Sequence, residues 1–189
     1  MDKKTKKALL ERIDKATDED LVEILNFLRE EGDTDFLVPL ARVLVKTGND
    51  AIKNEIKNIF LEVKRSAAPA EIIKIIESPE LSKEKKFFTE LCWQLNMDFS
   101  PHLEKMLDFF IEFDDLEMAL DMFSAIETTL AAYAPKFTPE QLERMKSKLK
   151  DNIQNFDHSK KLLSVQLTHV FDQAKRDSML GNINELNLE

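Results

Sequence analysis

A residue that can begin a helix returns at a fixed interval along this chain. Such capping residues stand 32 positions apart, at Asp18, Asp50, Ser82 and Asp114, with Asp115 as the alternative cap in the last case. The same interval relates two apolar positions inside the helices that would follow. One position is occupied by Ile24, Ile56, Phe88 and Leu120, and the other by Phe27, Ile59, Leu91 and Phe123. A self-similar period of about 20 to 50 residues is typical of stacked repeats, so the interval predicts a repeat architecture.

The clearest copy of the repeat covers residues 36–53. An apolar helix pattern is followed by Gly48, Asn49 and Asp50, a combination that predicts the end of one helix and the capped start of the next. Each repeat is therefore expected to be a pair of helices joined by a tight turn. The predicted repeats cover approximately residues 4–31, 33–65, 69–96 and 99–132.

Composition and length favour helices in one domain. The 189 residues include only three Gly and one Tyr, and runs of strand-forming aromatic and β-branched residues are scarce. A chain of this length can bury roughly two-thirds of the surface that its unfolded form would expose. We expect an all-α fold with a single domain over residues 1–176.

The turn at residues 48–53, preceded by the apolar run at residues 37–40, resembles a HEAT repeat. In that family the first helix often contains Pro, and the turn carries Asp followed by an apolar and then a basic residue. The matching positions here are Pro39, Asp50, Ile52 and Lys53. Other repeats lack a Pro inside their first helix, so the pattern is specific in one copy only. A tetratricopeptide array is the neighbouring alternative, but its Gly and aromatic positions are absent. The resemblance implies an armadillo-type α-solenoid, an α-α superhelix of about four HEAT-like helical hairpins.

The pattern changes beyond Pro135. Thr138 and Pro139 open a longer amphipathic helix, expected over residues 138–157, and a final helix is expected over residues 159–176. Their polar outer faces predict a pair of capping helices that cover the open end of a solenoid. Residues 177–189 are predicted to form a flexible tail.

Charge and hydropathy narrow the classes of partner. The formal net charge is −9, whereas nucleic-acid binding depends on Lys and Arg that neutralise phosphates. We therefore expect no nucleic-acid partner, with a local basic patch as the exception that this average would allow. Near the N-terminus only Ala8, Leu9 and Leu10 stand together before charge returns, so neither a signal peptide nor a membrane span is predicted. We expect a cytoplasmic protein that binds no membrane.

The sequence contains no motif that points to catalysis or metal binding. His102, His158 and His169 lack metal-ligand spacing, and neither a Gly-rich phosphate loop nor a nucleophile motif occurs. The single Cys92 has apolar neighbours and is interpreted as a core residue. We therefore expect a protein that is not an enzyme and that needs no metal and no cofactor.

One segment, residues 98–127, concentrates acidic residues. It holds nine Asp and Glu against Lys105 alone, which gives the segment a net charge of −8. One interpretation is a solvated outer face with ordinary helix caps. The other is an acidic docking surface for a basic or amphipathic partner. The candidate residues of this surface are Asp114, Asp115, Glu117 and Asp121.

A second candidate surface follows from helix geometry. With Ile56 and its equivalents at the centre of the buried face, Leu61 and its equivalents Trp93 and Ala125 point away from that face. Met118 and Met122 lie beside them. In HEAT-like arrays the second helices line the concave side, so the resemblance implies a partly exposed apolar ridge at Leu61, Trp93 and Met122. Burial of these residues by neighbouring repeats is the alternative.

These observations predict a non-catalytic scaffold that binds a protein or peptide. Two alternatives remain open. Some HEAT-like proteins act on DNA bases through a basic groove, and the corresponding positions here change from positive to negative along the chain. They are Lys53, Lys85 and Glu117 in one row and Lys57, Thr89 and Asp121 in the next. The other alternative is a structural subunit whose apolar ridge forms a homo-oligomer interface.

Overall fold

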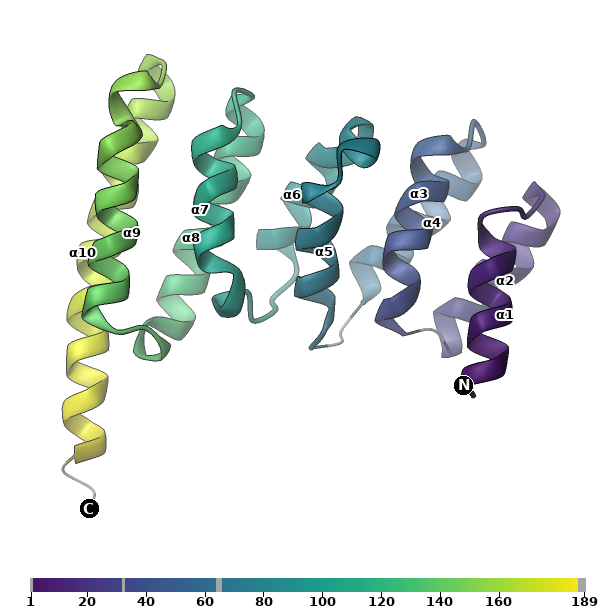
Figure 1. Ribbon diagram of the computed structural model, residues 1–189, viewed down its shortest axis with the longest axis horizontal. Coiled ribbons are helices and arrows are strands. Elements are labelled where there is room, and N and C mark those ends of the chain that lie inside the picture. The colour runs from purple at the N-terminus through teal and green to yellow at the C-terminus, as the bar shows by residue number, and fades with distance from the viewer. Residues whose placement is uncertain (1, 32, 64–65, 187–189) are drawn as a thin grey trace. The chain divides into compact units, whose positions relative to one another are not determined.

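A computed structural model describes residues 2–31, 33–63 and 66–186, and all regular structure in these ranges is helical (Figure 1). This confirms the all-α class. The α-helices are α1 (Lys3–Ile13), α2 (Asp18–Glu31), α3 (Leu37–Lys46), α4 (Asp50–Glu62), α5 (Ala68–Glu77), α6 (Lys85–Gln94), α7 (Leu103–Glu112), α8 (Leu116–Tyr133), α9 (Pro139–Asn152) and α10 (His158–Leu186). Short 3-10 helices are η1 (Thr34–Phe36), η2 (Pro79–Glu84), η3 (Ser100–His102), η4 (Ala134–Lys136) and η5 (Ile153–Asn155). None of the helices described is both long and apolar enough to cross a membrane.

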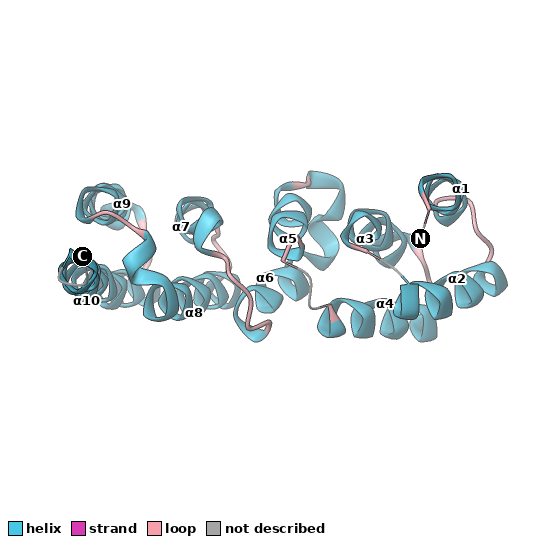
Figure 2. Cartoon of the chain, turned by 90° about the horizontal axis from the view of Figure 1, so that it is seen from below, coloured by secondary structure: helices cyan, strands magenta, loops and turns pink. Residues whose placement is uncertain are grey.

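The chain forms two compact units, residues 1–91 and 92–189. The boundary falls inside α6. In the first unit α1 packs against α2 and α3, α3 packs against α4 and α5, and α2 packs against α4. Figure 2 shows α1, α3 and α5 in one layer and α2 and α4 in the other. The first unit is therefore a two-layered stack of helical hairpins.

The second unit is built in the same way. Here α7 packs against α8 and α9, while α10 packs against α8 and α9. Figure 2 shows α7 and α9 in one layer and α8 and α10 in the other. Consecutive hairpins in this unit thus lie side by side. The first helix of one hairpin is next to the first helix of the other, and the second helices are likewise adjacent.

The predicted starts of the second helices are confirmed in the first two repeats and wrong in the third, and in the fourth the cap is Asp115, the alternative to Asp114. Helices α2 and α4 begin at Asp18 and Asp50, although Asn49 is the residue whose side chain caps α4. Ser82 lies within η2, and α6 begins only at Lys85. Pro79 fixes a backbone angle suited to a turn start, and buried Leu81 anchors η2. Helix α8 begins at Leu116, with Asp115 as its cap.

One of the two predicted buried positions moves by one residue in α8, whereas the other keeps the interval, since Phe123 is buried 32 positions after Leu91. Ile24, Ile56 and Phe88 are buried at the predicted spacing of 32, but the next buried residue in this series is Ala119, 31 positions after Phe88. The predicted core residue Leu120 is instead 46% exposed. A shift of one residue rotates a helix by about 100°, which is enough to exchange core and surface positions.

The prediction of a core position at Phe27 is also wrong, since its side chain is 39% exposed. Phe27 lies on α2, which packs against α1 and α4. Its equivalent Leu91 is fully buried, and Ile59 is partly buried. The side chain at this repeat position therefore becomes less exposed from Phe27 through Ile59 to Leu91.

The C-terminal pair begins as predicted but extends further. Thr138 forms a capping box with Gln141 at the start of α9. Helix α10 continues to Leu186 and extends past α9 (Figure 1), so the predicted tail is helical over residues 177–186. Buried Ser178 explains part of this, because its Oγ donates a 2.5 Å hydrogen bond to the carbonyl oxygen of Phe137. Residues 187–189 of the predicted tail lie outside the described residues.

Candidate partner-binding surface

The first turn of α8 is fixed by Asp115. Its carboxylate accepts hydrogen bonds from the backbone N–H groups of Glu117 (2.9 Å) and Met118 (3.0 Å). These N–H groups would otherwise lack a partner within the helix. Asp115, predicted as a docking residue, thus has a structural role, and it sets the direction in which the rest of α8 presents its side chains.

Helix α8 has a buried face and an outward face that differ in character. The buried face comprises Ala119, Met122, Phe123, Ala125, Ile126, Thr129 and Leu130. Leu116 and Leu120 lie one turn apart on the outward face and are 42% and 46% exposed. Glu117 and Asp121 form the next row, about 100° around the helix. The start of α8 therefore presents an apolar row beside an acidic row.

Trp93 of α6 extends this surface. Its side chain is 41% exposed, and its indole Nε1 donates a 3.0 Å hydrogen bond to Oδ1 of Asp121. Trp93 lies near the end of α6 and Asp121 lies on α8, and both residues belong to the second unit. The hydrogen bond restricts the indole in the free protein, which lowers the conformational entropy that binding would cost. We call Trp93, Leu116, Glu117, Leu120 and Asp121 the α6–α8 surface.

The structure separates the predicted site residues. Leu61 is 45% exposed on α4, in the first unit. The prediction that Met122 lies on an exposed ridge is wrong because Met122 is fully buried, and Met118 is half-buried. Asp114 is exposed and lines a pocket of about 380 Å³ together with Lys160. Trp93 and Asp121 are two predicted residues from different helices that a hydrogen bond between side chains brings together.

Sequence reasoning missed Leu116 and Leu120. The signal was present, because Ala119, Met122, Phe123, Ile126 and Leu130 have the spacing of one amphipathic helix face. Leu120 was predicted to be buried because it lies 32 residues after Phe88. The apolar spacing within α8 itself would have placed Leu120 on the exposed face.

Three acids of the acid-rich segment pair with bases of the following hairpin. Asp98 pairs with Lys136, Glu104 with Arg144 (2.9 Å), and Asp108 with Lys148. We call the last two contacts, Glu104–Arg144 and Asp108–Lys148, the α7–α9 ion pairs. Burial by itself raises the pKa of Asp98, but hydrogen bonds from Lys136 and Ser100 outweigh it and hold that pKa below its usual range. Asp98, Glu104 and Asp108 therefore stabilise the packing of this part of the chain against the following hairpin. The acids left for a docking surface are those of α8.

A buried cation closes the C-terminal end of α7. Lys160 of α10 is only 4% exposed, and its Nζ donates hydrogen bonds to the carbonyl oxygens of Ile111 (2.8 Å) and Phe113 (2.6 Å). The same Nζ lies 4.4 Å from the centroid of the Phe156 ring. Burial lowers the pKa of Lys160, and nearby Asp114 opposes this effect. The contacts match the preference of a helix C-terminus for positive charge.

Cys92 is buried, as predicted for a core residue, and burial raises the pKa of its thiol. Among the residues described, no group of three or more His, Cys, Asp or Glu side chains is arranged to hold a metal ion.

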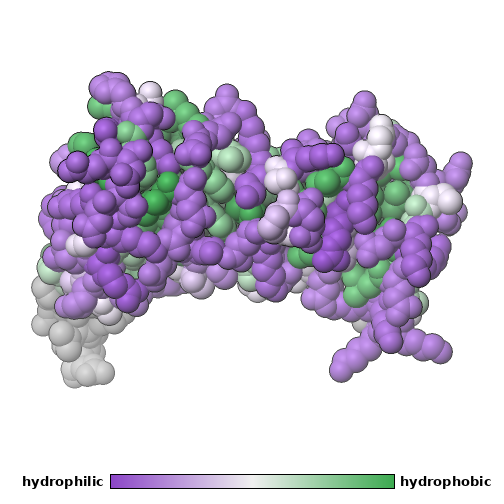
Figure 3. Space-filling model, turned by 45° about the horizontal axis from the view of Figure 1, so that its top comes forward, coloured by the Kyte–Doolittle hydropathy of each residue, from purple (hydrophilic) through white to green (hydrophobic). Residues whose placement is uncertain are grey.

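On the face shown in Figure 3, hydrophilic side chains form most of the surface and apolar side chains appear between them in separate patches.

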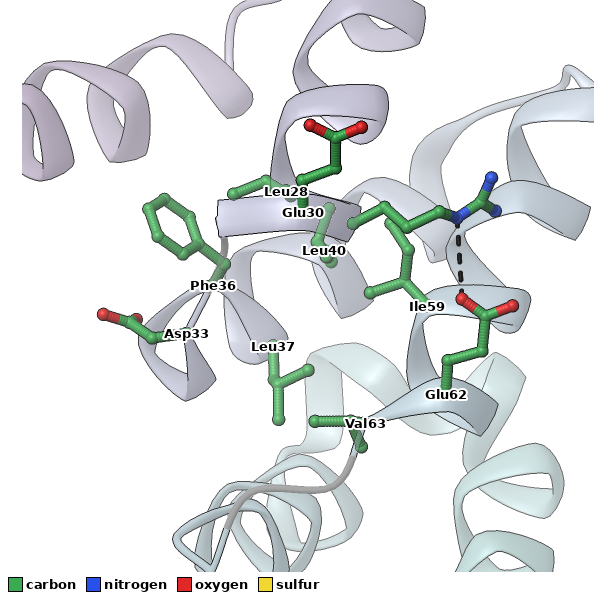
Figure 4. Close-up of a pocket in the computed structure, with 10 residues that line it drawn as sticks. Leu28, Glu30, Asp33, Phe36, Leu37, Leu40, Ile59, Glu62 and Val63 are labelled. Atoms are coloured by element: carbon green, nitrogen blue, oxygen red, sulfur yellow. Dashed lines mark ion pairs between the residues drawn. The ribbon is translucent and has the colours of Figure 1, made fainter. Parts of the chain in front are cut away.

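A pocket of about 240 Å³ lies in the first unit, between α2, α3 and α4 (Figure 4). Its apolar lining includes Leu28, Leu40 and Ile59, and the Nε of Arg29 forms a 3.5 Å ion pair with Glu62 beside them. This volume is below the range of about 300 to 1,000 Å³ that is typical of small-molecule sites. None of the predicted site residues lines it.

Comparison of the chain with protein-family models, with curated proteins and with solved structures finds no match.

Proposed function

We propose that this protein is a non-catalytic scaffold that binds a basic amphipathic protein segment on the α6–α8 surface. The observation that carries the proposal is the hydrogen bond that fixes a partly exposed Trp93 against Asp121. Trp is enriched among the residues that dominate binding energy at protein interfaces. Trp93 is thus an apolar anchor held to the helix that also exposes Leu116 and Leu120.

The chemistry of the partner follows from the two rows on α8. Leu116 and Leu120 would receive apolar side chains, and Glu117 and Asp121 would face Lys or Arg. A helix with apolar residues one turn apart and an adjacent basic row matches this pattern. The proposed architecture behind this surface is the HEAT-like solenoid inferred from residues 37–53, supported by the side-by-side hairpins within each unit.

The proposal can be tested with a synthetic amphipathic helix that carries Leu at every third and fourth position and Lys along one flank. Calorimetric titration should show saturable binding that weakens as salt is added, because exposed charges are screened. A scrambled peptide of the same composition is the control for non-specific attraction to an acidic protein. Equal affinity for the two peptides would overturn the proposal.

Variants locate the site. Trp93→Ala and Leu120→Glu should each weaken binding by about tenfold or more, the loss expected for an interface anchor. Leu61→Glu is the matched control, since Leu61 is similarly exposed but belongs to the other unit. Loss of binding in Leu61→Glu with retention in Leu120→Glu would place the site elsewhere.

We rank nucleic-acid binding below protein binding. A basic groove would need lysines in both rows, and one lysine of each row already has an acidic neighbour. Lys53 lies 3.9 Å from Asp50, and Lys57 lies 3.3 Å from Glu84. A gel shift with duplex DNA that disappears at high salt would reverse this ranking.

A further inference from the structure

The outward face of α10 lies opposite its packed face. The packed face includes Ser164, Leu167, Phe171, Ala174 and Ser178, which are all buried. About 180° around the helix, an exposed row runs along almost its whole length. The exposed row contains His158, Leu162, Val165, Gln166, His169, Gln173, Arg176 and Leu180, with Met179 at its edge.

This row is exceptional in its charge. The row itself contains no carboxylate between His158 and Leu180, although the chain has a formal net charge of −9. Two acids lie at its edges and both have a partner: Asp172 pairs with Lys146, and Asp177 accepts a hydrogen bond from Gln173. Like-charge repulsion opposes contact between two copies of an acidic protein over most of their surface. Two copies can therefore meet along the centre of this row, where Arg176 is the charged residue, with less repulsion than elsewhere.

Apolar side chains lie at both ends of the row and polar ones lie between them. Leu162 and Val165 are 55% and 52% exposed at one end, and Met179 and Leu180 are 44% and 60% exposed at the other. Leu162 and Leu180 are 18 residues apart, which corresponds to five helical turns and about 27 Å. They therefore lie on one line along the helix, on either side of a midpoint at residue 171.

We propose that α10 pairs antiparallel with α10 of a second copy, about a two-fold axis near residue 171. In this arrangement Leu162 of each copy faces Leu180 of the other, and His169 faces Gln173. Each contact occurs twice, as a two-fold symmetric interface requires. A parallel pairing would place Arg176 against Arg176 and would lose this complementarity. The surface is separate from the α6–α8 surface, and the pairing does not depend on the proposed function.

Light scattering and sedimentation of the whole chain test the pairing. The wild type should have twice the chain mass of 21.9 kDa at micromolar concentration. Leu162→Glu and Leu180→Lys should each raise the dimer Kd by about a hundredfold, because symmetry removes the altered contact twice. Circular dichroism checks that the variants remain folded, and Leu61→Glu is the matched exposed-leucine control that should stay dimeric.

Mixing the two monomeric variants tests the orientation. A heterodimer of Leu162→Glu with Leu180→Lys contains one Glu–Lys pair and one Leu–Leu pair, so the equimolar mixture should regain the dimer mass. A mixture of Leu162→Glu with Leu162→Lys should stay monomeric. Rescue by the second mixture instead of the first would overturn the antiparallel register. A wild type that stays monomeric throughout, or dimers that persist in both single variants, would overturn the interface.

Discussion

The indole N–H of Trp93 and the carboxylate of Asp121 are joined by a 3.0 Å hydrogen bond between α6 and α8. The side chain of Trp93 is nevertheless 41% exposed, so its emission should be quenched by acrylamide in the folded protein. Asp121→Ala removes the acceptor and should lower the fluorescence anisotropy of Trp93, which is the only Trp of the chain. Asp121→Asn is the control, because an amide oxygen can still accept the bond. A blue-shifted emission that acrylamide does not quench would contradict the exposed site.

Asn49 links the starts of two adjacent helices. Its Oδ1 accepts hydrogen bonds from the backbone N–H groups of Ala51 (3.0 Å) and Ile52 (3.4 Å), and its Nδ2 donates to Asp18 (2.8 Å). Asn49→Ala should lower the free energy of unfolding by about 1 kcal/mol, as measured by urea titration. Asn54→Ala, at an exposed position within α4, should not destabilise the protein, because Ala favours helix. A larger loss in Asn54→Ala than in Asn49→Ala would be inconsistent with the cap.

Lys160 should be important for stability in spite of its unfavourable burial. Lys160→Met keeps an apolar stem near Phe156 but leaves the carbonyl oxygens of Ile111 and Phe113 without this donor. We expect a loss of about 3 kcal/mol in the free energy of unfolding, because buried acceptors without a partner are costly. The neighbouring Lys161 is half-buried, and Lys161→Met should change stability by less than about 0.5 kcal/mol. Similar losses in both variants would show that charge at this end of α10 matters generally, rather than the contacts of Lys160.

Acid should weaken the pairing of α9 with α10. Hydrogen bonds from Lys175 (2.9 Å) and Lys146 lower the pKa of Glu143 from its usual 4.5 to about 2. A pKa that is lowered in the folded state stabilises it above the unfolded value of 4.5, and this contribution is lost as the pH falls towards 2. Asp172, bonded to Lys146 at 2.7 Å, has a lowered pKa and acts in the same direction.

The measurement is the free energy of unfolding as a function of pH between about 5 and 2. Glu143→Gln cannot titrate, so its stability should fall less steeply over this range than that of the wild type. Glu127→Gln is the matched control at an exposed position outside the α9–α10 pairs. The same slope in the wild type and in Glu143→Gln would contradict the role given to Glu143.

Local signals in the sequence were enough to predict the helical class and several boundaries. The starts of α2 and α4 and the capping box at Thr138 follow from short-range chemistry, in which a side chain bonds a backbone group two or three residues away. The predicted helix start at Ser82 was wrong because Pro79 and buried Leu81 favour a 3-10 helix before α6 begins.

The candidate site was less predictable because it depends on contacts between helices. Trp93 was recognised by its angular position, but its bond to Asp121 joins residues 28 positions apart. In α8 one buried position lies one residue earlier than the repeat interval implies. This change exchanged Leu120 for Ala119 in the core. The extension of α10 past residue 176 likewise depends on tertiary contact, through Ser178 and Phe137.

The α7–α9 ion pairs have a consequence for how the sequence can vary over time. Glu104 and Arg144 lie 40 positions apart, yet each is the other's partner, and Asp108 and Lys148 are related in the same way. Reversal of one charge sets two like charges beside each other, whereas reversal of both restores attraction. Natural variants should therefore change the two members of a pair together, so covariation between these positions would record the packing of α7 on α9.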